Sequence, residues 1–394
     1  MELARRMSRL GTETAFEVLV RAKELEQQGR DIIHLEIGEP DFDTPHNVIE
    51  AGVDALRHGA THYTPSAGIV PLREAIAEDQ SRRKGRKIDP SNVVVTPGGK
   101  PIMFYLMLAL LEEGDEVVYP DPGFPIYESM VDFIGARRIP VDFVEEGPKF
   151  RWDVDSAVRH MSPRTKLVII NSPSNPIGCI IPERDLERLA AAAVENDAFV
   201  LSDEIYSRIL YEGKHVSIST FPGMAERTCI LDGFSKTYAM TGWRLGFGIL
   251  PDWLAPSIAR LATNCNSCTA TFTQMAGEAA LTGPQEAVDD MVDEFRRRRD
   301  LVVERLNSIR GVRCAQPDGA FYVFPNIEGT GMTSRQAADY LLYDAGVAAL
   351  SGTAFGKNGE GYLRLSYANS YNNLQTALDR MKTAFESRTP VVAS

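Results

Sequence analysis

A lysine between two short apolar runs is the residue of this chain best suited to covalent chemistry. Lys236 lies in the segment 235–244, after the apolar run 228–231 and before the run 245–249. Small and aromatic neighbours would shield its amine from water, which favours the neutral form and lets it attack a carbonyl carbon. A surface lysine in a loop is the alternative for Lys236 taken alone.

Two other polar residues follow apolar runs that are typical of buried strands. Asp203 comes directly after the run 199–202, and Asn175 lies in the proline-rich loop that follows the run 167–170. Ligands of open α/β sheets bind at the carboxyl ends of the strands, and a buried carboxylate there needs a cationic or donor partner. A helix N-cap for Asp203 and ordinary turn chemistry for the loop are the alternatives.

A third candidate group has the composition of a site for a flat, charged ligand. Gly98 and Gly99 join an apolar run to a helical pattern, so their backbone amides could bind an anion at a helix N-terminus. A structural turn explains two glycines equally well. Phe124 stands in a proline-rich loop, where it either packs in the core or stacks on a heteroaromatic ring.

The segments around these residues predict an α/β fold. Helical periodicity alternates with runs rich in Val, Ile and Leu, which indicates a parallel or mixed sheet covered by helices on both faces. Helices are expected at 14–28, 46–57, 71–84 and 100–111, and strands at 32–37, 93–95, 116–119, 138–141, 167–170, 199–202 and 228–231. Beyond residue 286 we expect a smaller α+β domain, with helices at 294–309 and 334–345 and strands at 319–324 and 362–367.

Length and composition set further limits. A chain of 394 residues favours two domains, here a large one of residues 45–285 and a small one of 1–44 with 286–394. The net charge of −12 argues against a nucleic-acid or membrane partner, and no apolar run reaches the ~18 residues of a membrane span. The four consecutive arginines 296–299 are interpreted as a solvated helix face.

The cysteines indicate a reducing compartment. Five cysteines, an odd number, do not suggest a disulfide framework, and the N-terminal sequence does not resemble a secretory signal, so a cytoplasmic location is expected. Cys265 and Cys268 form a C-x-x-C pair for which chance spacing is favoured over a redox function. No second pair at ligand spacing follows, so no metal site is expected.

Taken together, these residues resemble a known family. A lysine, a phosphate-binding turn, a ring-stacking aromatic and an Asp followed by a Tyr describe a pyridoxal phosphate site. The segments 35–42, 98–100, 171–178, 202–206, 235–244 and 362–366 resemble, in this order, the class I/II aminotransferases of the aspartate aminotransferase type (fold type I). The resemblance runs from about residue 12 to 381. It implies a mixed, mostly parallel seven-stranded sheet, a homodimer and pyridoxal 5'-phosphate as the cofactor.

The resemblance also implies a role for each residue near the cofactor ring. Lys236 would bind the cofactor covalently and move a proton to and from the substrate. Asp203 would pair with the ring nitrogen, and Asn175 and Tyr206 would hydrogen-bond the phenolic oxygen. Phe124 would stack on the ring.

The phosphate and substrate ends are implied in the same way. The expected phosphate-binding residues are Gly98, Gly99, Lys100, Ser235 and Arg244, with Tyr63 reaching the phosphate of the neighbouring subunit. Gly233 stands where many relatives carry a serine or threonine that binds the phosphate. Arg364 would clamp the substrate α-carboxylate, beside Gly38 and Asn175.

The substrate prediction depends on Lys100, which matches a lysine that meets the distal carboxylate of the substrate in a bacterial subgroup of aspartate aminotransferases. We therefore favour aspartate or glutamate as donor and 2-oxoglutarate as acceptor in a ping-pong reaction. Transamination of alanine, branched-chain or aromatic amino acids is the alternative, as is β-elimination on the same site. Phe16 would either close over the substrate or belong to the core. A ligand-sensing protein is disfavoured, since no basic N-terminal extension is present.

Overall fold

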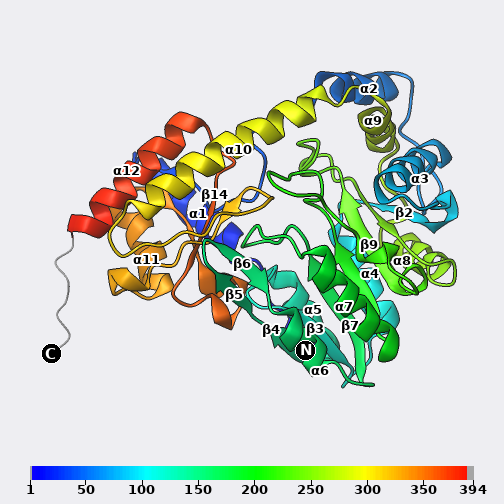
Figure 1. Ribbon diagram of the computed structural model, residues 1–394. Coiled ribbons are helices and arrows are strands. Elements are labelled where there is room, and N and C mark those ends of the chain that lie inside the picture. The colour runs from blue at the N-terminus through cyan, green and yellow to red at the C-terminus, as the bar shows by residue number, and fades with distance from the viewer. Residues whose placement is uncertain (1, 388–394) are drawn as a thin grey trace.

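A seven-stranded sheet forms the centre of the larger part of the molecule in the computed structural model, which describes residues 2–387 (Figure 1). The strands stand in the order β2–β10–β9–β8–β7–β3–β4. β10 runs antiparallel to both neighbours and the other neighbouring pairs are parallel, which confirms the predicted α/β class and the mixed, mostly parallel sheet. The bounds are Val93–Thr96 (β2), Glu116–Pro120 (β3), Arg137–Val141 (β4), Thr165–Asn171 (β7), Phe199–Asp203 (β8), Thr228–Gly233 (β9) and Gly246–Ile249 (β10).

Helices cover both faces of this sheet because its strands carry apolar side chains on both sides. In β7, Leu167 and Ile169 pack on the face covered by α4, α5 and α8, whereas Val168 and Ile170 face α6 and α7. α3 and α9 cover the second face where β2, β9 and β10 lie. The bounds are Val70–Lys84 (α3), Lys100–Leu110 (α4), Pro125–Ile134 (α5), Val154–His160 (α6), Glu183–Glu195 (α7), Ala255–Asn266 (α8) and Thr271–Thr282 (α9).

The smaller part is built from three helices and short strands. α10 connects it to the sheet: Val288, near its beginning, packs in the core of the larger part, and Phe295 and Leu306 pack in the core of the smaller one (Figure 1). The other elements are α11 (Ser334–Tyr340), α12 (Tyr371–Ser387), the sheet β11–β14–β13 and the parallel pair β1–β12. α10 spans Glu286–Asn307, and the strands are Ile33–His34 (β1), Tyr322–Val323 (β11), Val347–Ala348 (β12), Leu350–Ser351 (β13) and Leu363–Ser366 (β14).

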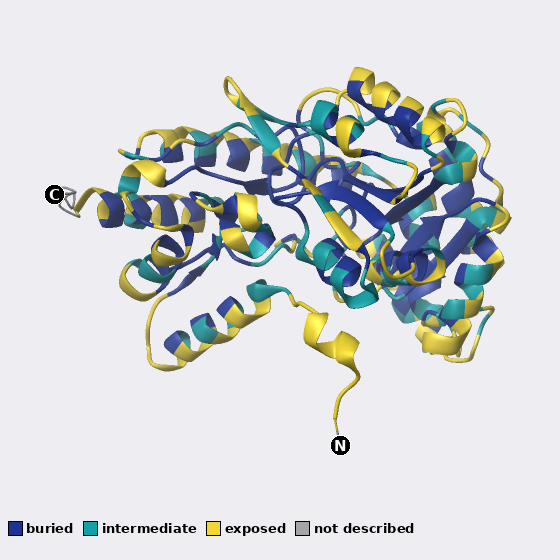
Figure 2. Cartoon of the chain, turned by 90° about the horizontal axis from the view of Figure 1, so that it is seen from below, coloured by how far each residue is buried: buried dark blue, intermediate teal, exposed yellow. Residues whose placement is uncertain are grey.

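The N-terminal segment packs on the smaller part through one face of α1, where Val18, Ala22 and Leu25 join an apolar cluster with Ala348 and Leu350. α1 (Thr14–Gln27) buries only one side, and the turn Arg5–Arg9 before it has no buried residue, as Figure 2 shows in yellow.

Two further elements flank the main sheet. α2 (His46–Arg57) packs against α9, and the hairpin β5–β6 (Phe143–Glu146, Lys149–Trp152) leaves the main sheet after β4. None of the helices within residues 2–387 is long and apolar enough to cross a membrane.

The strand predicted at 32–37 is wrong beyond its first residues. Only Ile33–His34 pairs as β1, and the backbone carbonyls of Glu36 and Gly38 accept hydrogen bonds from Arg364 and Lys236 instead of from a neighbouring strand. The strands predicted at 319–324 and 362–367 are also shorter than expected, and the helix predicted to begin at 294 begins at 286.

The prediction of a solvated face for the four arginines is wrong for two of them. Arg298 and Arg299 are buried, and Arg298 pairs with Asp41 at 2.6 Å and Glu294 at 2.8 Å. Its guanidinium also lies 4.9 Å from the centre of the Phe42 ring. A charged run thus contributes to the interior because its helix crosses from one core to the other.

One ion pair between α3 and β8 is buried almost completely, and we expect its loss to be costly. The Lys84 Nζ lies 2.7 Å from the carboxylate of Glu204, and the two side chains are 3% and 1% exposed. Replacing Lys84 by methionine leaves that carboxylate buried without its cation, which should lower the free energy of unfolding by about 3–5 kcal/mol. Urea unfolding of the purified variant, followed by circular dichroism, measures the loss.

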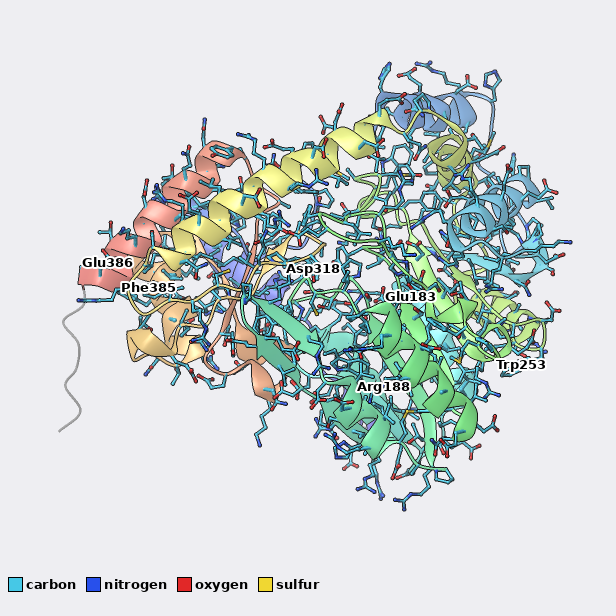
Figure 3. The ribbon with its side chains drawn as sticks, in the orientation of Figure 1. Glu183, Arg188, Trp253, Asp318, Phe385 and Glu386 are labelled. Carbon is cyan, nitrogen blue, oxygen red and sulfur yellow. The ribbon has the colours of Figure 1, made fainter. Side chains whose placement is uncertain are left out.

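Lys214→Met is the matched control for this variant. Lys214 is 80% exposed and lies 3.9 Å from Glu183 on the surface at the beginning of α7 (Figure 3), so its removal should cost less than about 1 kcal/mol. Equal losses in the two variants would contradict the assignment of the Lys84 pair as a structural support of β8.

Candidate active site

A cavity of about 540 Å³ opens at the carboxyl ends of β7, β8 and β9. Most of the residues that sequence analysis selected line it together: Gly38, Gly99, Lys100, Phe124, Asn175, Asp203, Tyr206, Ser235, Lys236, Arg244 and Arg364. The register explains part of this, since Asn171 of β7, Asp203 of β8 and Leu231 of β9 are neighbours across the sheet. Two predicted residues do not line the cavity. Gly98 lies next to the Arg244 guanidinium, and Tyr63 is 88% exposed on the surface.

Lys236 is the amine of this cavity. Its Nζ donates to the carbonyl oxygen of Gly38 at 2.5 Å and forms no ion pair within residues 2–387. Burial is the largest cause that lowers the pKa of Lys236, to about 8, while the charge of Glu39 acts in the opposite direction. A substantial fraction of the amine is therefore neutral near physiological pH, which is the form that attacks carbonyl carbon.

Asp203 is the carboxylate at the end of β8, and its donor comes from α5. The Tyr127 hydroxyl donates to Asp203 Oδ2 at 2.5 Å, and the backbone N–H of Ile205 donates to Oδ1 at 3.2 Å. Burial raises the pKa of Asp203 to about 6, and the two donors oppose that rise. A cationic ring N–H placed at this carboxylate would stabilise its charged form.

A pair of tyrosines borders the cavity on the side of the smaller part. The Tyr206 and Tyr322 hydroxyls lie 2.8 Å apart, and burial raises the pKa of both phenols. Asn175 lies next to them, its backbone N–H held by Asn171 Oδ1 at 2.7 Å. These groups offer neutral donors to an oxygen atom of a ligand.

Arg364 is a buried cation without a carboxylate partner among residues 2–387. Its guanidinium donates to the Glu36 carbonyl oxygen and to Asn175 Oδ1, the latter at 3.4 Å, and its Nε has no partner. The rings of Tyr322 and Phe355 lie 4.5 Å and 4.9 Å from the guanidinium carbon. Burial lowers the pKa of Arg364, and an incoming carboxylate would compensate for the lost water.

The opposite end of the cavity is suited to an anion. Gly98 has a φ of +86°, and a Cβ there would lie 2.3 Å from Arg244 Nη2, so only glycine lets the guanidinium reach the loop. Arg244 itself has a φ of +54°, and its guanidinium donates hydrogen bonds to the carbonyl oxygens of Thr241 and Pro97. A non-glycine residue held in this backbone region is strained, which is frequent at ligand sites.

Gly233 is a packing position rather than a cavity residue. A Cβ on this residue would lie 3.0 Å from Gly246 Cα and 3.2 Å from the Leu245 carbonyl oxygen of the adjacent strand. The close approach of β9 and β10 therefore makes a side chain at position 233 tight, so that a serine or threonine there would require the neighbouring strand to shift slightly.

Lys100 faces a carboxylate that sequence analysis did not consider. Its Nζ pairs with Glu13, which precedes α1, and lies 5.4 Å from the centre of the Phe124 ring. Lys100 is half exposed, and Phe16, 58% exposed, lines the same entrance. Phe16 is thus at the cavity and not in the core.

Three residues of this site were missed. Tyr127 follows Phe124 by three positions on a helix that begins at Pro125, a spacing that places both on one face. Tyr322 lies in a segment that was interpreted only as a strand, and Glu13 precedes the predicted helix 14–28 and was given no role. The helical spacing could have revealed Tyr127, whereas the other two contacts depend on how distant segments fold together.

The arrangement can bind a flat ligand that carries a phosphate at one end and a ring nitrogen at the other. It can then hold a substrate carboxylate at Arg364, within the same cavity as the Lys236 amine. No group of three or more His, Cys, Asp or Glu side chains is placed to hold a metal ion in the part of the chain that the structure describes.

Comparison with known proteins gives consistent results. The family model "Aminotransferase class I and II" matches residues 30–381. The aspartate aminotransferase of Pyrococcus abyssi is 42% identical over 91% of this chain and 93% of that protein. Aromatic-amino-acid aminotransferase 2 of Thermococcus litoralis is 41% identical over 93% of this chain and 94% of that protein. The solved structure of Thermus thermophilus aspartate aminotransferase with maleate superimposes with a TM-score of 0.90 at 39% identity, covering 98% of this chain and 100% of that one.

The buried amine predicts a trade-off between the site and stability. Because burial lowers the pKa of Lys236 to about 8, the charged form destabilises the fold at neutral pH. Replacing Lys236 by methionine should raise the free energy of unfolding of the cofactor-free protein by about 1–2 kcal/mol at pH 7. The gain should shrink between pH 8 and 10.5, where the wild-type lysine is neutral when folded and charged when unfolded.

Denaturant unfolding of both proteins at several pH values measures this effect. Lys87→Met, which removes an exposed lysine, is the control and should give a difference near zero at every pH. A Lys236→Met protein that is no more stable than the wild type at pH 7 would contradict the low pKa.

Proposed function

The chain belongs to the class I and II aminotransferases, and we propose that it transfers the amino group of aspartate or glutamate to a 2-oxo acid with pyridoxal 5'-phosphate in the cavity around Lys236. The family has the fold type I architecture described above and generally depends on this cofactor. One observation carries the proposal: a buried amine of low pKa and a buried arginine without a carboxylate partner share one cavity. Such a pair suits a substrate with an α-amino and an α-carboxylate group.

The residues at the anion end fit the cofactor's phosphate. Arg244 has no carboxylate partner within residues 2–387, and the loop at Gly98 leaves space for it beside the first turn of α4. We assign the phosphate to the Gly99 amide, Ser235 and Arg244, with Lys100 nearby. The Gly98 amide already donates to the Thr96 carbonyl oxygen, so Gly98 serves this site by letting the Arg244 guanidinium approach the loop. The guanidinium without a carboxylate partner supports the assignment.

The ring end fits as well. We assign the ring nitrogen to Asp203, the phenolic oxygen to Asn175 and Tyr206, and the ring face to Phe124. Tyr127 is added as the residue that orients the Asp203 carboxylate. When bound, pyridoxal phosphate supplies an electron-accepting ring and a carbonyl group that exchanges with the substrate's amino group.

The protein side chains then have separate tasks. Arg364 holds the substrate α-carboxylate with Gly38 and Asn175 beside it, and this fixes the α-carbon toward Lys236. The neutral Lys236 amine removes the proton from that α-carbon and returns it in the reverse half-reaction. Above a pH of about 6, the Asp203 carboxylate is charged and stabilises a proton on the ring nitrogen.

We also propose the wider organisation predicted from the sequence. A homodimer in which Tyr63 reaches the neighbouring site is supported by the full exposure of this tyrosine outside its own cavity. The boundary of the small domain at residue 286 is supported by α10, which begins there and leads into the second core; the part beyond residue 387 lies outside the described residues. A cytoplasmic location is supported by five free cysteines.

Aromatic amino acids are the second candidate donors. Phe16, Phe124 and Phe355 line the cavity, and one relative named above is an aromatic-amino-acid aminotransferase. The apolar entrance at Phe16 would suit such a side chain.

A donor panel against 2-oxoglutarate tests the proposed function. The purified protein should be yellow from its bound cofactor, and a good donor should bleach the visible band and yield the 2-oxo acid. Aspartate and glutamate should give the highest kcat/KM. Lys236→Ala should bind cofactor without turnover, and a wild-type protein that takes up no cofactor would contradict the proposal.

The distal carboxylate gives a prediction of its own. Replacing Lys100 by serine should lower kcat/KM for aspartate, with a loss of about 1.5–3 kcal/mol of transition-state stabilisation. The kcat/KM for alanine should stay nearly unchanged, because only aspartate has a second carboxylate. Glu13→Gln should act in the opposite direction, since Glu13 now occupies Lys100. Steady-state kinetics with both donors decide the matter, and an unchanged preference for aspartate over alanine in Lys100→Ser would exclude this role.

A further inference from the structure

His34 lies between two carboxylates, one from the strand segment and one from α1. Its Nδ1 is 2.7 Å from Glu36 Oε1, and its Nε2 is 3.1 Å from Glu26 Oε1. An ionised carboxylate only accepts hydrogen bonds, so an imidazole that satisfies two of them must carry a proton on each nitrogen. The geometry therefore favours the imidazolium form, and the hydrogen bond to Glu36 is the largest cause that raises the pKa of His34.

Glu36 is the reason that this charge matters. Its side chain is 0% exposed, and its Oε2 has no hydrogen-bond partner. A buried carboxylate needs a nearby cation, and His34 is the one that it contacts in the part of the chain that the structure describes.

The same glutamate lies at the proposed substrate clamp. The backbone carbonyl of Glu36 accepts a hydrogen bond from Arg364, and the charge of the Glu36 carboxylate favours the charged form of that arginine. Arg364 has no carboxylate partner among residues 2–387, and the Glu36 carboxylate is a charge of the protein itself that acts on it. Glu36 thus links the two cations, since its carboxylate contacts the His34 ring and its backbone carbonyl contacts the Arg364 guanidinium.

We propose that His34 is a positioning residue whose imidazolium holds the Glu36 carboxylate as its partner and so keeps the Arg364 guanidinium available for the substrate α-carboxylate. The proposal rests on the role assigned to Arg364 under the proposed function. A neutral ring at position 34 leaves Arg364 as the remaining cation for the buried glutamate, and the substrate must then compete with Glu36.

The charged groups around this contact come from four segments. α1 contributes Glu26, which also pairs with Lys23, and Glu13 before α1 acts on Arg364 from the cavity entrance. Tyr206 and Tyr322 face Arg364 as neutral phenols. His34 is the titrating group in contact with Glu36, and Lys236, whose pKa is about 8, is a second titrating group on which the charge of Arg364 acts. Substrate affinity should fall as the pH rises through the pKa of His34, which lies above 6.5, and that part of the fall should be absent in Glu36→Gln.

Kinetics of the holoenzyme with its best amino donor test the proposal. His34→Gln should raise KM by about tenfold at pH 7 and leave kcat within about twofold. The tenfold figure follows because a nearby charge changes the equilibrium constant of an ionised group by a factor of about ten or more. Glu36→Gln should keep a low KM and remove its rise with pH. The double variant should match Glu36→Gln, because without the glutamate no competitor remains.

His58→Gln is the matched control. His58 contacts the carboxylate of Asp54 at 3.2 Å but is 74% exposed on α2, so its KM should equal that of the wild type. An unchanged KM in His34→Gln would overturn the proposal, as would losses that add in the double variant, which is the result of a merely structural role. If His34→Gln does not fold, the pH dependence of KM is compared between the wild type and Glu36→Gln. A rise of KM with pH that is lost in Glu36→Gln supports the proposal, and an equal rise in both proteins overturns it.

Two measurements separate this proposal from the function on which it rests. The ¹⁵N titration of the His34 imidazole should give a pKa above 6.5 that falls in Glu36→Gln, and this result does not depend on activity. Arg364→Leu should raise KM strongly. An unchanged KM in Arg364→Leu refutes the proposed clamp, whereas a raised KM there with an unaffected His34→Gln refutes the role of His34.

Discussion

Burial of charged groups without an opposite charge is the constraint on which this structure depends. Lys236, Asp203 and Arg364 each lose water in the cavity, and the protein gives each of them neutral hydrogen-bond partners instead of a counter-ion. The consequence is a lysine that loses its proton easily and an arginine that still needs an anion. The unfavourable solvation is compensated when a ligand binds, as expected for a preorganised site.

Behind this layer, carboxylates in or just after the same strands have partners on α3. Glu204, next to Asp203, contacts Lys84 and the hydroxyls of Ser202 and Ser217. Asp232 accepts from the backbone of Gly233 and from Gln80, with Arg83 3.8 Å away. Neighbouring residues at the ends of β8 and β9 therefore differ in function, since Asp203 faces the cavity whereas Glu204 and Asp232 contact α3.

The α/β class and the candidate positions of Lys236, Asp203 and Asn175 could be predicted from local patterns in the sequence. The expected roles of Tyr206, Arg244 and Arg364 came from the resemblance to a known family instead. Apolar runs define the buried strands, and the residues that follow each run must meet at one edge of a parallel sheet. The contacts that the sequence did not reveal join segments far apart in the chain. Glu13 at Lys100 is one such contact, and Arg298, whose charge suggested solvent exposure, is buried at Asp41.

The irregular segment after β1 has a stereochemical consequence. Its carbonyl oxygens at Glu36 and Gly38, two residues apart, hold the guanidinium of Arg364 and the amine of Lys236. Under the proposed roles, one short piece of backbone thereby fixes the distance and direction between the substrate carboxylate and the base. With the amino group directed to the cofactor, three points around the α-carbon are defined. Only one mirror image of an amino acid can then present its α-hydrogen to Lys236, so the enzyme selects handedness through its main chain.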